Sequence, residues 1–101
     1  MYSMDNLNKL PKMGKLAPEA MTAFRAYDKA ALADGAIPKK YKELMATAVA
    51  LTTQCPYCIE VHRHEALKAG ATEQELAEVV YVASALRAGA AITLGTHLIV
   101  G

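Results

Sequence analysis

Residues 38–70 read PKKYKELMATAVALTTQCPYCIEVHRHEALKAG, and this stretch decides the fold. It holds two helical patterns separated by a break near residues 52–54. The first pattern runs from Pro38 to about Thr52, and the second starts at Pro56 and ends at Gly70, a residue common just after a helix. We therefore expect two consecutive helices that fold back on each other as an antiparallel hairpin.

Helical patterns also flank this stretch. A helix is expected from Pro18 to a stop at residues 34–38, because Pro suits a first helical turn. After Gly70, the segment Thr72-Glu73-Gln74-Glu75 matches a capping box and opens a further helix. A fifth, shorter element is expected from Ala88, as a helix or a strand. Residues 1–17 show no sustained period and are assigned to an N-terminal arm or loose lead-in, with one domain over 18–101. The fold class is all-α, with about five helices.

Two cysteines stand at the start of the second helix of the hairpin, in Cys55-Pro56-Tyr57-Cys58. This spacing allows the thiols to close a disulfide on the first helical turn. The free backbone N–H groups and the dipole of a helix N-terminus favour a thiolate, which is the attacking species in thiol–disulfide exchange. The loop closed by such a bridge is too short to constrain the unfolded chain much. The pair therefore predicts redox chemistry rather than a structural bridge.

His62 follows Cys58 by four residues and thus lies on the same helix face. A histidine beside a thiol can take its proton. Glu43 would meet His62 if the hairpin turns near residues 52–54, giving a chain of Glu43, His62 and Cys58. Other interpretations stay open, since His62 could be an ordinary core histidine and Glu43 a surface carboxylate. Glu60 and Glu65 compete with Glu43, whereas His64 is expected to face solvent.

A zinc site is the main alternative use of the cysteines. Structural zinc generally takes four protein ligands, and the chain has no second CxxC and no paired histidine spacing. We therefore expect no metal and no other cofactor.

Composition limits the possible partners. The chain of 101 residues carries 11 basic and 10 acidic side chains, a net charge of +1, so no nucleic-acid partner is expected. Hydrophobic residues make up 53% of the chain, which favours a homo-oligomer, although an apolar monomer or a membrane-surface protein would share this composition. No signal peptide is evident, and the apolar tract from Ala88 to Val100 is shorter than a membrane span. A cytoplasmic protein that does not enter the membrane is expected.

Glu43, eleven further residues, Cys55-Pro56-Tyr57-Cys58, three residues and His62 together resemble the signature of alkylhydroperoxidase D-like proteins of the carboxymuconolactone decarboxylase superfamily. The resemblance covers residues 18–98 and is closest to the single-domain branch. It implies an all-helical homo-oligomer, commonly a trimer or a hexamer. It further implies that Cys58 is the nucleophile, that Cys55 is the resolving thiol, and that Glu43 and His62 form a proton relay.

The same resemblance implies a peroxidase or disulfide oxidoreductase that an external dithiol regenerates and that can pass electrons to a peroxiredoxin. Some members carry a histidine between the cysteines where this chain has Tyr57. A proton relay without that second histidine is therefore expected here. Two other functions stay open. One is a decarboxylase or lactone-processing enzyme, as the superfamily name suggests. The other is a non-enzymatic oligomer whose assembly responds to the disulfide.

Overall fold

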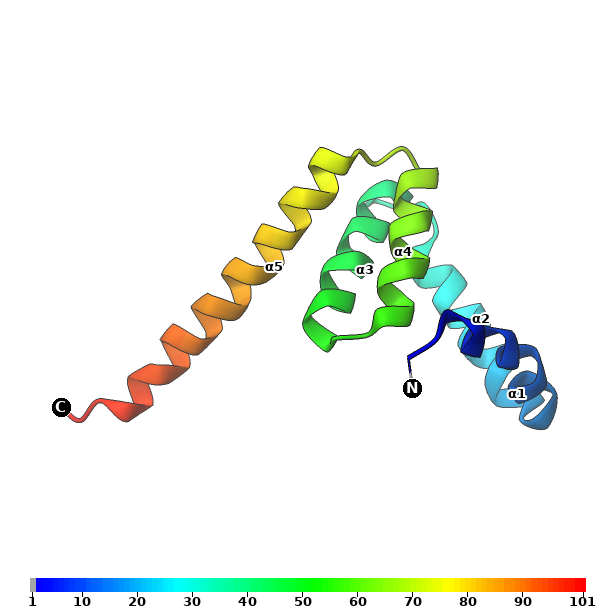
Figure 1. Ribbon diagram of the computed structural model, residues 1–101, viewed down its shortest axis with the longest axis horizontal. Helices are drawn as coiled ribbons and strands as arrows, with labels where there is room; N and C mark the ends of the chain where they lie inside the picture. Colours follow the sequence, from blue (N-terminus) through cyan, green and yellow to red (C-terminus); the bar gives the residue numbers. More distant parts are fainter. Residues whose placement is uncertain (1) are drawn as a thin grey trace.

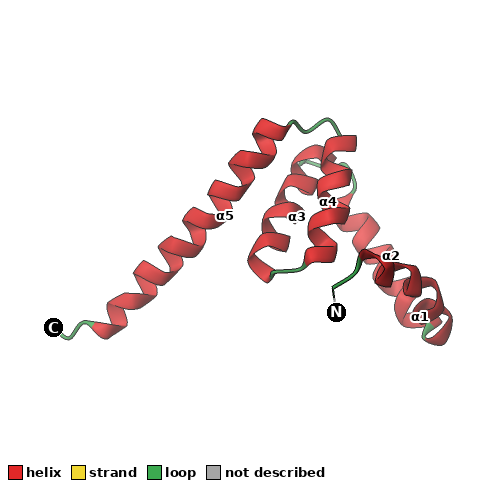
Figure 2. Cartoon of the chain, viewed as in Figure 1, coloured by secondary structure: helices red, strands yellow, loops and turns green. Residues whose placement is uncertain are grey.

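The computed structural model describes residues 2–101, and these residues form helices and loops with no strand. The all-α class is therefore confirmed (Figure 2). Five α-helices lie between two short 3₁₀ helices. In chain order the elements are η1 Met4–Lys9, α1 Leu10–Leu16, α2 Pro18–Leu32, α3 Lys39–Thr53, α4 Pro56–Lys68, α5 Glu73–Leu94 and η2 Gly95–Leu98.

Helices α3 and α4 form the expected hairpin and lie side by side in Figure 1. Two small side chains are buried between the helices, since Ala50 of α3 is 2% exposed and Ala66 of α4 is fully buried, and Glu43 is the longer side chain buried with them. Small side chains let two helix backbones approach closely. The turn falls at Gln54, whose backbone is left-handed with φ 56°, and the N–H of Cys55 then donates to the carbonyl of Ala50 at 3.1 Å. This turn places Cys55 directly at the start of α4.

The end of α4 and the start of α5 follow the sequence signals. Gly70 adopts φ +99°, a conformation that favours glycine, and its N–H donates to the carbonyl of Leu67 at 3.0 Å. The N–H of Ala71 donates to the carbonyl of Ala66 at 2.9 Å, which completes a Schellman motif. Thr72 and Glu75 form the predicted capping box at the first turn of α5. These bonds satisfy backbone groups that a helix end leaves unpaired.

The predicted break at Ala88 is wrong, because α5 continues without interruption to Leu94 and no strand follows it. Gly89 sits within this helix with nothing near the position of a Cβ. A helical glycine costs only about 1 kcal/mol relative to alanine, and the neighbouring alanines are strong helix formers. The glycine therefore weakens the helix without ending it.

Helix α5 leaves the rest of the chain and gives the molecule an extended shape. Figure 1 shows it running from the top of the hairpin to a distant C-terminus. The principal extents are 57 × 31 × 30 Å and the radius of gyration is 17.0 Å, against about 13 Å for a typical globular domain of this length. Many apolar side chains on this helix and beyond it are exposed: Val80, Tyr81, Val82, Leu86, Ile92, Leu94, Leu98, Ile99 and Val100.

By length and composition alone, the segment Glu73–Leu98 could cross a membrane, and little of it is buried within the chain. Measuring the apolar tract from Ala88 underestimated its length, because α5 begins fifteen residues earlier. A helix that other subunits cover can have the same length and composition. The finding therefore describes the apolar surface of α5 and does not place the helix in a membrane.

The N-terminal residues form a helical arm rather than a loose lead-in. Ser3 caps η1 by accepting the N–H of Asp5 at 3.3 Å, and Pro11 stands in the first turn of α1. Helix α1 packs against α2, where the side chain of Met21 lies against Gly14. The aromatic side chains of α2 stay open to solvent, since Phe24 is 60% and Tyr27 74% exposed.

Candidate active site

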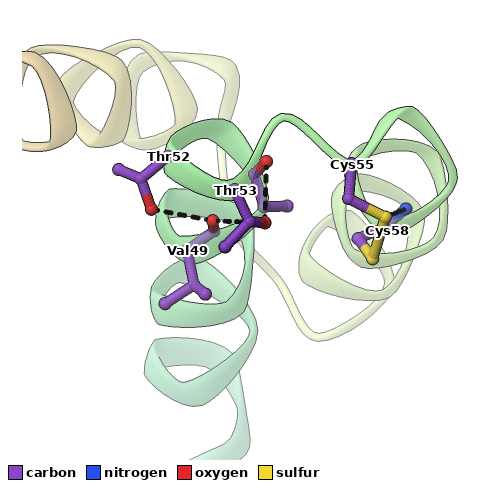
Figure 3. The surroundings of a disulfide bond; sticks show 6 residues. Val49, Thr52, Thr53, Cys55 and Cys58 are labelled. Atoms are coloured by element: carbon purple, nitrogen blue, oxygen red, sulfur yellow. Dashed lines mark hydrogen bonds between the residues drawn. A yellow bond between two sulfur atoms is a disulfide. The ribbon is translucent and has the colours of Figure 1, made fainter.

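Cys55 and Cys58 are joined by a disulfide at the N-terminus of α4, as Figure 3 shows, with their Cα atoms 5.3 Å apart. Cys55 is the N-cap residue, and its Sγ accepts the backbone N–H of Cys58 at 3.2 Å. Pro56 occupies the first helical position, where its missing N–H removes no helix bond. One sulfur thus caps the helix while the other stands in its first turn, where the helix dipole favours negative charge.

The last turn of α3 faces this pair across the loop (Figure 3). The hydroxyls of Thr52 and Thr53 donate to the carbonyl of Val49, at 2.9 and 3.0 Å. These hydroxyls are therefore engaged within their own helix.

Glu43 and His62 meet across the hairpin, as the sequence predicted. His62 Nδ1 lies 2.7 Å from Glu43 Oε1. Since a carboxylate can only accept, Nδ1 carries the hydrogen and Nε2 is the ring nitrogen left to exchange a proton. The Glu43 side chain is 1% exposed and that of His62 20% exposed. The competing Glu60 and the neighbouring His64 are exposed.

Lys39 is a third ionic group that contacts the Glu43–His62 pair, and the sequence did not predict it. The Nζ atom of Lys39 lies 2.8 Å from Glu43 Oε2, one helical turn before it. Burial works to raise the pKa of Glu43, but the hydrogen bonds from Lys39 and His62 and the attraction of both groups outweigh it and hold the pKa below its ordinary value. The hydrogen bond that Lys39 donates to Glu43 correspondingly raises the pKa of Lys39. Glu43 and Lys39 are therefore both charged at neutral pH.

Cys58 and His62 share the wall of a cavity of about 440 Å³ between α4 and the N-terminal helices. Cys55 is not among the residues that line it. Most of the lining is apolar, with a charged edge from Arg25 and Asp28. The full lining is Leu7, Leu10, Met21, Phe24, Arg25, Asp28, Tyr57, Cys58, Val61 and His62. A small molecule in this cavity would reach Cys58 and the histidine together.

The N-terminal arm contacts the residue between the two cysteines. Asn6 Nδ2 donates to Tyr57 Oη at 2.9 Å, and the rings of Tyr2 and Tyr57 meet edge to face with centroids 5.8 Å apart. These contacts fix the side chain of Tyr57. Leu7 and Leu10 of the same arm line the cavity, so the arm also forms one of its walls.

Among the described residues, no group of three or more histidine, cysteine, aspartate or glutamate side chains is arranged to hold a metal ion. The chemistry available at the site comes from a dithiol, an imidazole and a buried carboxylate. This combination can deprotonate a thiol, stabilise the resulting thiolate and give up two electrons by closing a disulfide.

Comparison with protein families gives a match to the carboxymuconolactone decarboxylase family over residues 18–98. The matched range includes the hairpin, both cysteines, Glu43 and His62. Two uncharacterized bacterial proteins are similar to the chain. One, protein 4 in the cox locus of Paracoccus denitrificans, is 51% identical over 69 residues, which cover 68% of this chain and 62% of that protein. The other, from Cupriavidus necator, is 41% identical over 70 residues, covering 69% and 62%. The chain thus spans less than two thirds of these relatives.

Two solved structures share the fold. The apo form of a carboxymuconolactone decarboxylase family protein from Legionella pneumophila superposes with a TM-score of 0.77 at 43% identity, over 81% of this chain and 73% of that one. A protein from Methanobacterium thermoautotrophicum gives a TM-score of 0.80 at 32% identity, over 87% of this chain and 96% of the other.

Proposed function

Because the chain belongs to the carboxymuconolactone decarboxylase family, we propose that it is a thiol-dependent oxidoreductase that reduces a peroxide or a disulfide through Cys55 and Cys58. The observation that carries the proposal is the cavity where Cys58 meets His62, which is itself bonded to buried Glu43. A bridge that served only to hold the first turn of α4 would need neither this cavity nor a histidine–carboxylate pair.

In the first step, His62 takes the proton of Cys58 and the thiolate attacks the outer oxygen of a hydroperoxide. A sulfur–oxygen bond forms and the oxygen–oxygen bond breaks. The sulfur is oxidised to a sulfenic acid, and the leaving alkoxide takes the proton back from His62 to become an alcohol. Glu43 holds Nδ1 of His62 throughout, so that the imidazolium keeps its counterion.

In the second step, the thiol of Cys55 attacks the sulfur of Cys58. The disulfide forms, and the hydroxyl of the sulfenic acid leaves as water with the thiol proton. The short separation of the two Cα atoms, 5.3 Å, suits this closure. An external dithiol then reopens the bridge by exchange and becomes a disulfide itself. With a peroxiredoxin partner, the restored dithiol passes its two electrons to the oxidised cysteine of that partner in place of a peroxide.

The order of the cysteines follows from their positions. Cys58 lines the cavity beside His62, whereas Cys55 caps the helix and accepts an N–H from Cys58. We therefore assign Cys58 as the nucleophile and Cys55 as the resolving thiol. With a disulfide substrate, the same thiolate attacks sulfur in place of oxygen.

The exposed apolar surface of α5 supports a homo-oligomer, such as the trimer or hexamer that the family resemblance implies. A cavity of about 480 Å³ between α3 and α5 has a mostly apolar lining that includes Met45, Val79 and Val82. We propose that other copies of the chain cover this groove and the exposed face of α5. The cytoplasm is the compartment we propose, because its reductants would keep the dithiol cycling.

The test is peroxide consumption by the reduced protein with a dithiol reductant. Cys58→Ser should abolish turnover, while Cys55→Ser, assayed without added reductant, should consume about one peroxide per chain and stop at the sulfenic acid. His62→Ala should slow the reaction by about 10²–10⁴-fold, the usual worth of a positioned general base. His64→Ala, on the exposed face of the same helix, should leave the rate unchanged. Full activity in Cys58→Ser would sink the proposal.

The family name favours a second candidate, a decarboxylase acting on a carboxymuconolactone. Decarboxylation has no evident use for two thiols. If the Cys55→Ser, Cys58→Ser double variant converted such a lactone at the parent rate, this candidate would replace the first. A redox-responsive oligomer without turnover would instead change mass on oxidation and show no peroxide consumption.

A further inference from the structure

Lys39 is held beside the thiol site by three groups. Its backbone N–H donates to Asp34 Oδ1 at 2.6 Å, so the aspartate binds the chain at the start of α3. Its ammonium donates to the carbonyl of Leu32 at 3.5 Å and to Glu43 Oε2 at 2.8 Å. Both the main chain and the charged end of Lys39 are therefore fixed, although the side chain is 39% exposed.

The two oxygens of Glu43 are divided between two partners. Oε2 contacts Lys39 and Oε1 contacts His62, which sets the plane of the carboxylate across the hairpin. A buried carboxylate with only one partner would retain an oxygen without a strong donor and would tend to take up a proton. The lysine thus completes the environment in which the carboxylate can stay charged.

We propose that Lys39 is a positioning residue of the thiol site, which keeps Glu43 ionised and leaves Oε1 free to hold His62. The inference rests on the proposed function, because it assigns a role within the same relay. Lys39 itself touches neither sulfur, and it acts through Glu43 and His62.

Other charged groups near the pair do not replace Lys39. Glu65 on α4 and Asp34 before α3 both raise the pKa of Lys39 by electrostatic attraction and so stabilise its charged form. On the α5 side, Glu75 is paired with Lys40 at 2.9 Å. The groups that lower the pKa of Glu43 are Lys39 on its own helix and His62 on α4.

Removing the lysine charge has a defined consequence. Burial would then act on Glu43 against His62 alone, and the carboxyl would protonate at a higher pH. Once neutral, Glu43 no longer supports an imidazolium beside Cys58, and the thiolate loses its counterion. The pH at which Cys58 becomes reactive should therefore rise.

The experiment measures the alkylation rate of Cys58 by iodoacetamide against pH in reduced protein. The parent is Cys55→Ser, because serine keeps an N-cap acceptor and leaves one thiol. Lys39→Gln and Lys39→Met should each move the acid limb of the profile upward by about one pH unit. Lys39→Arg should restore it, since arginine keeps the charge. Lys40→Gln, which removes the neighbouring ion pair, should leave it in place.

An unmoved limb in Lys39→Gln and Lys39→Met would overturn the inference, as would an equal shift in Lys40→Gln. A displaced limb in Lys39→Arg would overturn it too. Circular dichroism checks that each variant is folded. If only one of Lys39→Gln and Lys39→Met folds, that variant alone is sufficient for the test. Alkylation does not involve peroxide. A protein that lacks peroxide turnover but shows the Lys39 dependence would therefore refute the proposed function and leave this inference standing.

Discussion

Glu43 shows how a single residue links folding to chemistry in this hairpin. The side chain is almost completely buried, yet it carries a charge that two flanking groups from different helices stabilise. Burying a charge without such partners is costly, so the carboxylate ties α3 to α4 only while Lys39 and His62 remain in contact. The same contacts hold His62 beside Cys58.

Stability should therefore depend on acid pH through Glu43. Its pKa is lower in the folded chain than the ordinary 4.5, so its contribution is complete above that value and is lost as pH falls through the folded pKa. Glu43→Gln should flatten the decline in unfolding free energy below about pH 4.5. Urea titrations from pH 7 to pH 3 would check this expectation.

Part of that decline should survive in Glu43→Gln, since the bonds from Lys40 and the Thr72 backbone also lower the pKa of Glu75. Lys40→Gln provides the comparison for that smaller part. An identical pH dependence in Glu43→Gln and the parent would show that the buried carboxylate is not ionised.

The sequence predicted the Glu43–His62 contact because spacing from the hairpin turn is a property of two regular helices. It did not predict a role for Lys39. The signal was present, since Lys39 and Glu43 are four residues apart and therefore share a helix face. Solvent exposure along that face depends on how α4 packs, and composition does not reveal it.

At the scale of elements, the turn between α3 and α4 sets the geometry of the dithiol. Gln54 adopts a left-handed backbone that most residues other than glycine avoid. The N–H of Cys55 bonds back to Ala50 across this turn, and the same residue caps α4. A substitution at Gln54 that disfavours the left-handed conformation would therefore displace both helix ends and the first sulfur.

Gln54→Val should destabilise the chain by about 1–2 kcal/mol, because a β-branched residue tolerates this conformation poorly. Gln54→Gly should be neutral or slightly stabilising. Denaturant midpoints of the two variants give the comparison. Gln74→Val, at an exposed position in the first turn of α5, provides the control for side-chain propensity. Equal destabilisation by Val at both positions would contradict the role given to the turn.

Local signals fixed some helix ends and not others. Thr72 with Glu75, and Gly70, are explicit start and stop residues, and the structure confirms both. The expected break at Ala88 was wrong because small residues and one glycine weaken a helix without supplying a cap. Helices η1 and α1 were not predicted from the sequence. Together they span only 13 residues, from Met4 to Leu16, which is too short a segment for a helical periodicity to be recognised.

At the scale of the whole molecule, one chain exposes more apolar surface than a stable soluble domain usually does. Tyr81 and Ile92 are each 75% exposed and Leu86 is 67% exposed, all on α5. Contiguous exposed apolar patches typically mark interfaces. The extended shape follows, since α5 contacts α3 along one side, as far as the bond from Arg87 to the carbonyl of Thr52, and leaves its other sides exposed.

Sedimentation at micromolar concentration should give a mass that is a whole multiple of 10.8 kDa. Leu86→Asp with Ile92→Asp should lower that mass, because two charges would be buried in the interface. Gln74→Glu adds charge at an exposed site near the helix start and should leave the mass unchanged. A parent that sediments as a monomer would refute the proposed assembly. Binding to lipid vesicles would point instead to a membrane surface.

The central claim is that Cys58 attacks peroxide oxygen and Cys55 closes the bridge. The most direct test mixes fully reduced protein with one equivalent of an alkyl hydroperoxide and follows thiols and peroxide together. We expect one peroxide to disappear for every two thiols lost, with the Cys55–Cys58 disulfide as the product and a rate well above that of a free thiol. Loss of peroxide no faster than with a free dithiol would contradict the account.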